Sequence, residues 1–232
     1  MHPESPWTIS MNQLTFGKEI TKHTGYYQIR KGKFTSLRGQ TTSVVVKTCG
    51  VAADVDTRRK LQNESEILKL IGECYNIVQL MGTCENQGDF HEVLECCPAG
   101  SLNNYLRENS SKLDNANELL LGMAISIAHG MEYIADRKFV HRDLGTENIL
   151  ISSSNVIKIC GFGYATLAGK NPLKIPELTN WRSKSFESLC DGIYTIQGDV
   201  WSFGIVLWEL LSPGTSTLKQ FLDKIIVFKA GF

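Results

Sequence analysis

The sequence predicts a protein of the α+β class, with a β-rich N-terminal part followed by a mainly helical C-terminal part. Up to about residue 94, short runs rich in β-branched and apolar residues dominate, with one helical pattern among them. After residue 98, apolar residues recur at helical spacing over longer stretches. The chain has 232 residues, of which 42% are hydrophobic and 21% charged, and this is enough for one two-part unit with a sizeable core.

The N-terminal part contains strand-like runs on both sides of one helix. Residues 34–49 end in Val44-Val45-Val46 and predict a strand, because β-branched residues favour that conformation. Residues 58–71 place their apolar side chains at helical spacing. Residues 76–81 and 90–94 are short apolar runs that predict further strands.

The C-terminal part begins after the connector near Pro98. Residues 119–134 form an apolar stripe with the period of a helix, and residues 149–151 and 156–159 predict short strands. Residues 164–184 lack periodicity and predict a long loop, a feature that is usually functional inside a compact domain. Residues 199–211 predict a strongly apolar helix that should be buried.

Charge and cysteine content exclude several classes of function. Lys and Arg together number 24, as do Asp and Glu, so the chain lacks the basic excess of proteins that bind nucleic acid or acidic membranes. Seven cysteines without a Cys-x-x-Cys pair favour buried thiols in a reducing compartment over disulfides or a zinc site. Residues 1–13 do not resemble a signal peptide, and residues 200–211 are too short to span a bilayer. We therefore expect no membrane contact from this segment.

One motif points to phosphoryl transfer. His141-Arg142-Asp143-Leu144, followed by Asn148, matches the pattern H-R-D-L-x-x-x-N of the protein-kinase catalytic loop. Such a loop supplies a carboxylate near the acceptor hydroxyl and a metal ligand a few residues later. The chain thus resembles the protein kinase superfamily, tyrosine-kinase type, as in the catalytic domains of receptor tyrosine kinases. The resemblance makes Asp143 the general base and Asn148 a metal ligand, with Arg142 beside them.

The flanking motifs follow in the family's order. Val44-Val45-Val46-Lys47 resembles V-A-I-K, and Glu64 falls where the family has the glutamate that pairs with this lysine. Leu94-Glu95-Cys96-Cys97 resembles the hinge, with Leu94 as gatekeeper, and residues 199–204 resemble the D-V-W-S-F-G helix. The nucleotide-binding residues that the resemblance implies are Lys47, Glu64, Ile29, Val45, Glu95, Cys97 and Leu150.

The resemblance covers essentially the whole chain and implies a two-lobed fold. We expect a β-rich N-lobe over about residues 1–94, a hinge at residues 95–98, and a C-lobe at residues 99–232. Residues 221–232 resemble the helix that precedes the family's last two helices, so we expect a truncated C-lobe. Glu187 matches the glutamate of A-P-E, and the arginine that pairs with it in the family has no counterpart here, so Glu187 should be exposed or unusually paired.

The residues that handle phosphate and metal depart from the family pattern. Gly161-Phe162-Gly163 stands where the family has D-F-G, whose aspartate binds magnesium. Lys22, Thr24 and Tyr27 stand where three glycines of the phosphate loop belong, and Val45 replaces the alanine next to adenine. Asn148 is then the one remaining metal ligand.

The acceptor side departs as well, whereas the internal packing residues are kept. Gly145-Thr146-Glu147 replaces A-A-R, and no tyrosine lies between residues 165 and 187, so Arg142 lacks its usual phosphate partner. By resemblance, four side chains form an apolar column between the lobes above Asp199. They are Leu68, Leu80, His141 and Phe162.

Three interpretations follow from this division. The leading one is a pseudokinase that acts as a signalling scaffold or allosteric binding module, with other signalling proteins as partners. The alternative is a low-activity, ATP-dependent protein tyrosine kinase that uses Asp143, Asn148 and Lys47. A third is a fragment that folds poorly. ATP and magnesium are the cofactors that the resemblance implies, and the expected location is the cytoplasm, including the intracellular portion of a membrane receptor.

Overall fold

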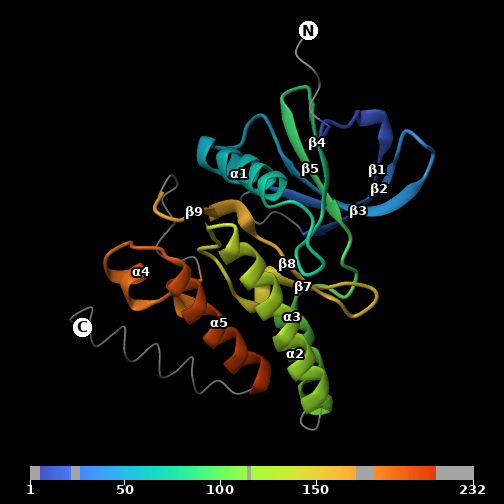
Figure 1. The fold of residues 1–232 in the computed structure, drawn as a ribbon. Coiled ribbons are helices and arrows are strands. Elements are labelled where there is room, and N and C mark those ends of the chain that lie inside the picture. Colours follow the sequence, from blue (N-terminus) through green and yellow to red (C-terminus); the bar gives the residue numbers. More distant parts are fainter. Residues whose placement is uncertain (1–5, 22–26, 114–115, 171–179, 213–232) are drawn as a thin grey trace.

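The computed structural model describes residues 6–21, 27–113, 116–170 and 180–212, and Figure 1 shows their arrangement. A five-stranded antiparallel sheet with one helix is followed by a mainly helical part that contains two small two-stranded sheets. This confirms the predicted α+β class. Lys22, Thr24 and the helix expected at residues 221–232 lie outside the described residues. In the described part of the chain, no helix combines the length and hydropathy needed to cross a bilayer.

The large sheet has the strand order β1-β2-β3-β5-β4, and every neighbouring pair is antiparallel. Its strands are β1 (Leu14–Thr21), β2 (Gln28–Thr35), β3 (Thr41–Cys49), β4 (Leu80–Asn86) and β5 (Asp89–Glu95). Helix α1 (Val55–Ile71) lies against one face of this sheet (Figure 1). A short 3-10 turn, η1 (Met11–Gln13), precedes β1.

Two predicted strands in this part have wrong limits. The run at residues 34–49 is not one strand, because β2 ends at Thr35 and the chain reverses through a turn in which Gly39 has φ of 80°. Glycine adopts that conformation without steric cost, so Gly39 was the available signal for a hairpin. The run at residues 76–81 enters a strand only at Leu80. Ile77 and Val78 are buried because they pair with Ile159 outside the large sheet.

Helix α1 begins three residues earlier than predicted because Asp54 caps it. The Asp54 carboxylate accepts hydrogen bonds from the backbone N–H and the hydroxyl of Thr57, at 2.8 and 2.7 Å. Such a cap satisfies backbone donors that have no partner within the helix. The helix ends at Ile71 and is capped by Gly72, whose φ is 75°. Its buried face therefore presents Glu64 and Leu68 to the sheet and the core.

The helical part is built from α2 (Leu102–Leu113), α3 (Asn117–Asp136), α4 (Phe186–Cys190) and α5 (Ile196–Leu211). Its short strands pair as β6 (Phe139–Val140) with β9 (Thr166–Leu167), and as β7 (Ile149–Ile151) with β8 (Ile157–Ile159). Three 3-10 turns are η2 (Thr146–Asn148), η3 (Phe162–Tyr164) and η4 (Trp181–Ser183). The loop expected at residues 164–184 thus contains β9 and η4, and its residues 171–179 lie outside the description.

The predicted burial of the helix at residues 199–211 holds for only one face of α5. Val206 and Leu210 belong to the main core, but Val200, Trp201 and Leu211 are 63, 48 and 59% exposed. A helix that packs on one side buries only the stripe that faces its neighbours. Overall apolar content therefore overstated how much of this helix would be covered.

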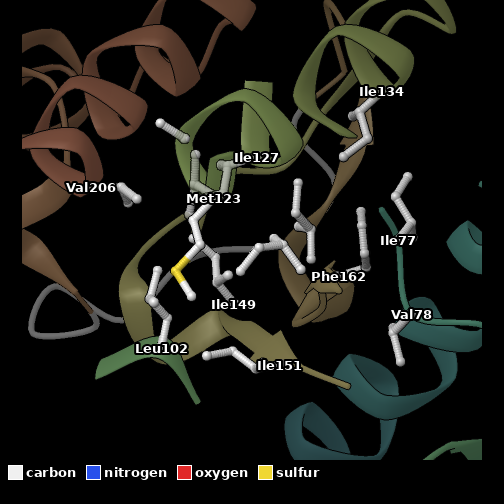
Figure 2. Packing of buried hydrophobic residues seen from close by; sticks show 14 of the residues in the cluster. Ile77, Val78, Leu102, Met123, Ile127, Ile134, Ile149, Ile151, Phe162 and Val206 are labelled. Atoms are coloured by element: carbon white, nitrogen blue, oxygen red, sulfur yellow. The ribbon is translucent and has the colours of Figure 1, made fainter. Parts of the chain in front are cut away.

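One continuous apolar core joins the sheet to the helical part. It combines Leu80 and Leu94 of the sheet with side chains from α1, α2, α3, α5, β7 and β8. Figure 2 shows Met123 and Ile127 of α3 in this cluster together with Ile149 and Phe162. Phe162 is fully buried, so the segment that contains Gly161 is anchored in the core at its next residue.

Candidate functional site

The H-R-D segment is held from beneath by Asp199 of α5. The Asp199 carboxylate accepts hydrogen bonds from the backbone N–H groups of His141 and Arg142, at 2.6 and 3.0 Å. Burial raises the pKa of Asp199 to about 7, although these two donors oppose the shift. Arg142 has φ of 68°, a conformation that is uncommon for residues other than glycine. The helix therefore fixes the backbone that presents Asp143.

The His141 ring is neutral and acts as a packing element. Burial lowers its pKa to about 4. Its Nδ1 accepts from the Asp143 N–H at 3.2 Å, so Nε2 carries the proton and donates to the Cys160 carbonyl at 2.9 Å. The ring lies 4.8 Å from that of Phe162, centroid to centroid. Leu68, Leu80 and Phe162 are buried in the same cluster, as expected for the column above Asp199.

The Asp143 carboxylate is enclosed by other side chains. Asn148 Nδ2 donates to its Oδ2 at 3.1 Å, and Asn180 Nδ2 donates to its Oδ1 at 3.1 Å. Lys184 Nζ lies 4.0 Å from Oδ1, and the Asp143 side chain is only 7% exposed. Burial raises the pKa of Asp143, while the charges of Lys184 and Lys60 oppose this. Asn148 and Asn180 therefore cover both oxygens of this carboxylate in part.

Gly161 adopts a backbone conformation that favours glycine, and Asn148 fills the space beside it. Its φ is 82°, and a Cβ placed there would lie 2.6 Å from both Cγ and Oδ1 of Asn148. Asn148 Nδ2 also donates to the Asp143 carbonyl at 2.7 Å, so the NH2 group of this amide is held by the catalytic loop. The backbone N–H of Gly161 points instead to Glu64 Oε1, at 3.3 Å.

These residues do not fit a magnesium site. Magnesium requires near-octahedral coordination by oxygen and usually takes one or two carboxylates from the protein. Gly161 offers no side-chain oxygen, and burial raises the pKa of the neighbouring Cys160 to about 12, which keeps its thiol protonated. Among the described residues, no cluster of three or more His, Cys, Asp or Glu side chains could hold a metal ion.

The predicted pair between Lys47 and Glu64 is present. Lys47 Nζ on β3 lies 2.7 Å from Glu64 Oε1 on α1, and both side chains are buried. Lys47 also lies 3.4 Å from Oε2 of Glu92 on β5, a contact that sequence reasoning missed. Period-two alternation could have found it, because Glu92 and Leu94 are two residues apart on one strand and so face the same side.

The remaining nucleotide-binding candidates lie on the sheet and the segments after it. Ile29 on β2 is opposite Lys47, and Val45 on β3 is opposite Leu94. Leu150 lies in β7 opposite Lys158. Each of these three residues therefore lies in a strand, two in the large sheet and one in the β7–β8 pair.

The hinge candidates are engaged in local contacts. Glu95 ends β5, and its Oε1 accepts the Gln79 N–H at 2.8 Å and lies 2.8 Å from Lys158 Nζ. The Cys97 carbonyl accepts the Gly100 N–H at 3.2 Å, and burial raises the pKa of the Cys97 thiol to about 12. The Glu95 side chain therefore ties β5 to the segment after the catalytic loop.

An aromatic ring lies beside Lys47. The Tyr27 ring centroid lies 5.7 Å from Lys47 Nζ. Burial raises the pKa of Tyr27 to about 12, so its hydroxyl stays protonated near neutral pH. Tyr27 is one of the residues that replace glycine in the family pattern. A side chain thus stands where close backbone approach to phosphate was expected.

The acceptor side contains contacts that the sequence did not predict. The Arg142 guanidinium donates to the Tyr164 carbonyl at 3.2 Å and lies 4.5 Å from the Tyr194 ring centroid. Thr146 donates to Glu209 Oε2 at 2.7 Å, at the wall of a cleft of about 220 Å³. Glu187 is half-buried in the first turn of α4, where its pKa is lowered by backbone and Ser185 hydrogen bonds.

Comparison with known proteins agrees with this geometry. Residues 14–229 match the family model described as protein tyrosine and serine/threonine kinase. Fibroblast growth factor receptor 1 of Pleurodeles waltl is 33% identical over 243 residues, and that of Xenopus laevis is 31% identical over 244 residues. Each comparison covers 92% of this chain and 29% of the receptor, so the chain spans less than a third of those proteins. The chain belongs to the protein kinase family and is a tyrosine-kinase-like domain.

Proposed function

We propose that this domain is a pseudokinase, a kinase fold that acts as a signalling scaffold or allosteric binding module with weak or no phosphoryl transfer. The observation that supports this most is the absence of a metal-binding side chain at residue 161, where the family has an aspartate. Gly161 supplies no ligand, and the Asn148 amide fills the space where a side chain at residue 161 would begin. We infer that such a site does not hold magnesium in position for phosphoryl transfer.

The contrast between kept and lost features supports the same proposal. Asp199, His141 and Phe162 keep the contacts that hold the catalytic loop and core together. Asp143 accepts hydrogen bonds from Asn148 and Asn180 and is only 7% exposed, so little of the carboxylate is open to an acceptor hydroxyl. A binding module needs the contacts that hold the fold together, but it does not need an accessible catalytic base.

A second candidate is a low-activity, ATP-dependent protein tyrosine kinase that transfers the γ-phosphate to protein hydroxyls. The ion pair between Lys47 and Glu64 favours it, because this pair is the arrangement that an active kinase requires. In that case Asp143 would serve as base, with Asn148 the one metal ligand. The nucleotide would contact Ile29, Val45, Glu95, Cys97 and Leu150.

Domain limits, partners and location belong to the same proposal. We assign an N-lobe to about residues 1–94, a hinge to 95–98 and a C-lobe to 99–232. Because the relatives are named as growth factor receptors, we propose that this domain works in the intracellular portion of a membrane receptor and contacts other signalling proteins.

Nucleotide binding with and without magnesium tests the proposal. Calorimetry with ATP should give the same affinity in excess magnesium and in EDTA, because the described residues lack the metal ligands. An Asn148→Ala variant serves as a control, since its affinity should also be independent of magnesium. A clear gain in affinity on adding magnesium, lost in Asn148→Ala, would favour the enzyme instead.

A further inference from the structure

Glu92 is placed beside Lys47 by the pairing of two strands. Residues 47 and 92 are directly opposite each other in the β3–β5 ladder. Side chains that are opposite in an antiparallel pair project from the same face and lie close together. That face is covered by α1, which adds Glu64 and Ser65. The Glu92 side chain is fully buried between these elements.

The contacts of Glu92 fix its position without neutralising it fully. Ser65 Oγ donates to Oε1 at 2.9 Å. Oε2 lies 3.4 Å from Lys47 Nζ, but it has no hydrogen bond among the described residues. Glu64 holds the same ammonium group more closely, at 2.7 Å. The cluster therefore contains two carboxylates and one ammonium group, and it has an excess negative charge when all three are ionised.

The protonation of this cluster follows from burial and from the charges around it. Burial, followed by repulsion from Glu64, raises the pKa of Glu92 to about 8, while Lys47 and the Ser65 hydrogen bond oppose the shift. Burial would lower the pKa of Lys47, but the two carboxylates outweigh it and raise that pKa well above its usual value. Tyr27 and Cys160, which also face the cluster, have pKa values of about 12 and stay neutral at moderate pH.

We propose that Glu92 is a specificity-determining residue whose ionised carboxylate disfavours phosphate at Lys47. A phosphate that binds Lys47 must do so beside two carboxylates, because Glu64 and Glu92 lie 2.7 and 3.4 Å from its Nζ. A built-in like charge is a common way to reject a ligand that the rest of a site would accept. In its ionised form, Glu92 thus lowers nucleotide affinity independently of Gly161. The inference rests on the proposed function in one respect only: both take Lys47 as the residue that a nucleotide phosphate would contact.

The experiment compares Glu92→Gln with the wild-type protein in ATP binding without magnesium, in EDTA, at pH 7.5 and 9. Glutamine keeps the shape and the acceptor for Ser65 but removes the charge. Wild-type affinity should fall about tenfold between the two pH values, a change of about 1.4 kcal/mol, as Glu92 ionises. Glu92→Gln should bind about tenfold or more tightly than wild type at pH 9 and should lose the pH dependence. Glu66→Gln, an exposed charge change on the same helix, should behave as wild type.

Two further variants test whether a gain in ATP affinity arises at Lys47 and guard against misfolding of Glu92→Gln. Adding Lys47→Met to Glu92→Gln should abolish the gain, because the lysine is the group that becomes available. Glu92→Val, which is apolar and needs no hydrogen bond, replaces the glutamine variant if that protein does not fold. Equal affinity of wild type and Glu92→Gln at both pH values, or no ATP binding by any variant, would overturn the inference. Because no transfer is measured, an active wild-type enzyme would contradict the pseudokinase proposal and leave this result standing.

Discussion

Placing a side chain at residue 161 should destabilise the domain before any metal chemistry begins. The φ of 82° costs a residue with a β-carbon about 1–2 kcal/mol. A Cβ 2.6 Å from Asn148 must also push that amide away from its hydrogen bonds to Asp143. Each such bond contributes about 1 kcal/mol. We expect Gly161→Ala to lower the free energy of unfolding by about 2–4 kcal/mol in total.

Denaturant unfolding measures this cost, and the chain offers a matched control. Gly39 has nearly the same φ, 80°, but a Cβ there would meet nothing within 4 Å. Gly39→Ala should therefore show the backbone cost alone, and the difference between the two variants isolates the collision with Asn148. If Gly161→Ala is no more destabilising than Gly39→Ala, the reasoning about a filled metal position is refuted.

Aspartate at the same position separates strain from metal binding. Gly161→Asp should be somewhat less destabilised than Gly161→Ala, because aspartate tolerates positive φ better than alanine. Magnesium should stabilise Gly161→Asp and leave Gly161→Ala unchanged in a thermal melt. Turnover should stay low, since Asp143 remains enclosed by Asn180 and Lys184. Magnesium-independent melting of Gly161→Asp would mean that a carboxylate alone cannot restore the site.

Two other predictions concern groups that hold the catalytic loop. Because His141 is buried with a pKa near 4, against about 6.5 when unfolded, its contribution to stability is present above pH 6.5. About 3 kcal/mol of that contribution is lost as the pH falls to 4, at about 1.4 kcal/mol per pH unit. An NMR titration of the ring should show a midpoint near 4, and a midpoint near 6.5 would contradict the packing role. Asp199→Asn should cost about 2–4 kcal/mol, since the amide offers one acceptor to two buried N–H donors. The exposed Asp191→Asn is its control in chemical unfolding, and equal stability of the two variants would count against that role.

Sequence motifs predicted two kinds of site residue. These are residues a few positions apart on one loop, and residues that the family pairs across a known order of elements. The H-R-D-L-x-x-x-N spacing placed Asp143 and Asn148 on one loop, and the pairing of Lys47 with Glu64 followed from family order. Strand and helix limits were less accurate, because apolar runs do not reveal a turn such as that at Gly39. For α5, the apolar content of the sequence did not indicate which face of the helix is covered by other elements.

The contacts that close the site could not be read from local patterns. Asn180 and Lys184 reach Asp143 from a distant segment of the chain, and Asn180 is 37 residues from Asp143 in the sequence. The stacking of Tyr194 on Arg142 is similarly remote. Such contacts depend on how whole elements pack, which periodicity does not specify. Glu92 is the exception, because strand alternation alone would have placed it on the inner face.

The most direct test of the pseudokinase proposal is phosphoryl transfer itself. The purified protein is incubated with labelled ATP, magnesium or manganese and a tyrosine-containing polymer, and incorporation is followed over time beside an Asp143→Asn variant. Loss of one preorganised group that stabilises such a transition state typically costs about 10²–10³ in rate, and here the metal ligand and an open base are both altered. We predict no incorporation above that of Asp143→Asn. Time-dependent incorporation by the wild-type protein that Asp143→Asn abolishes would contradict the account and identify the domain as an active kinase.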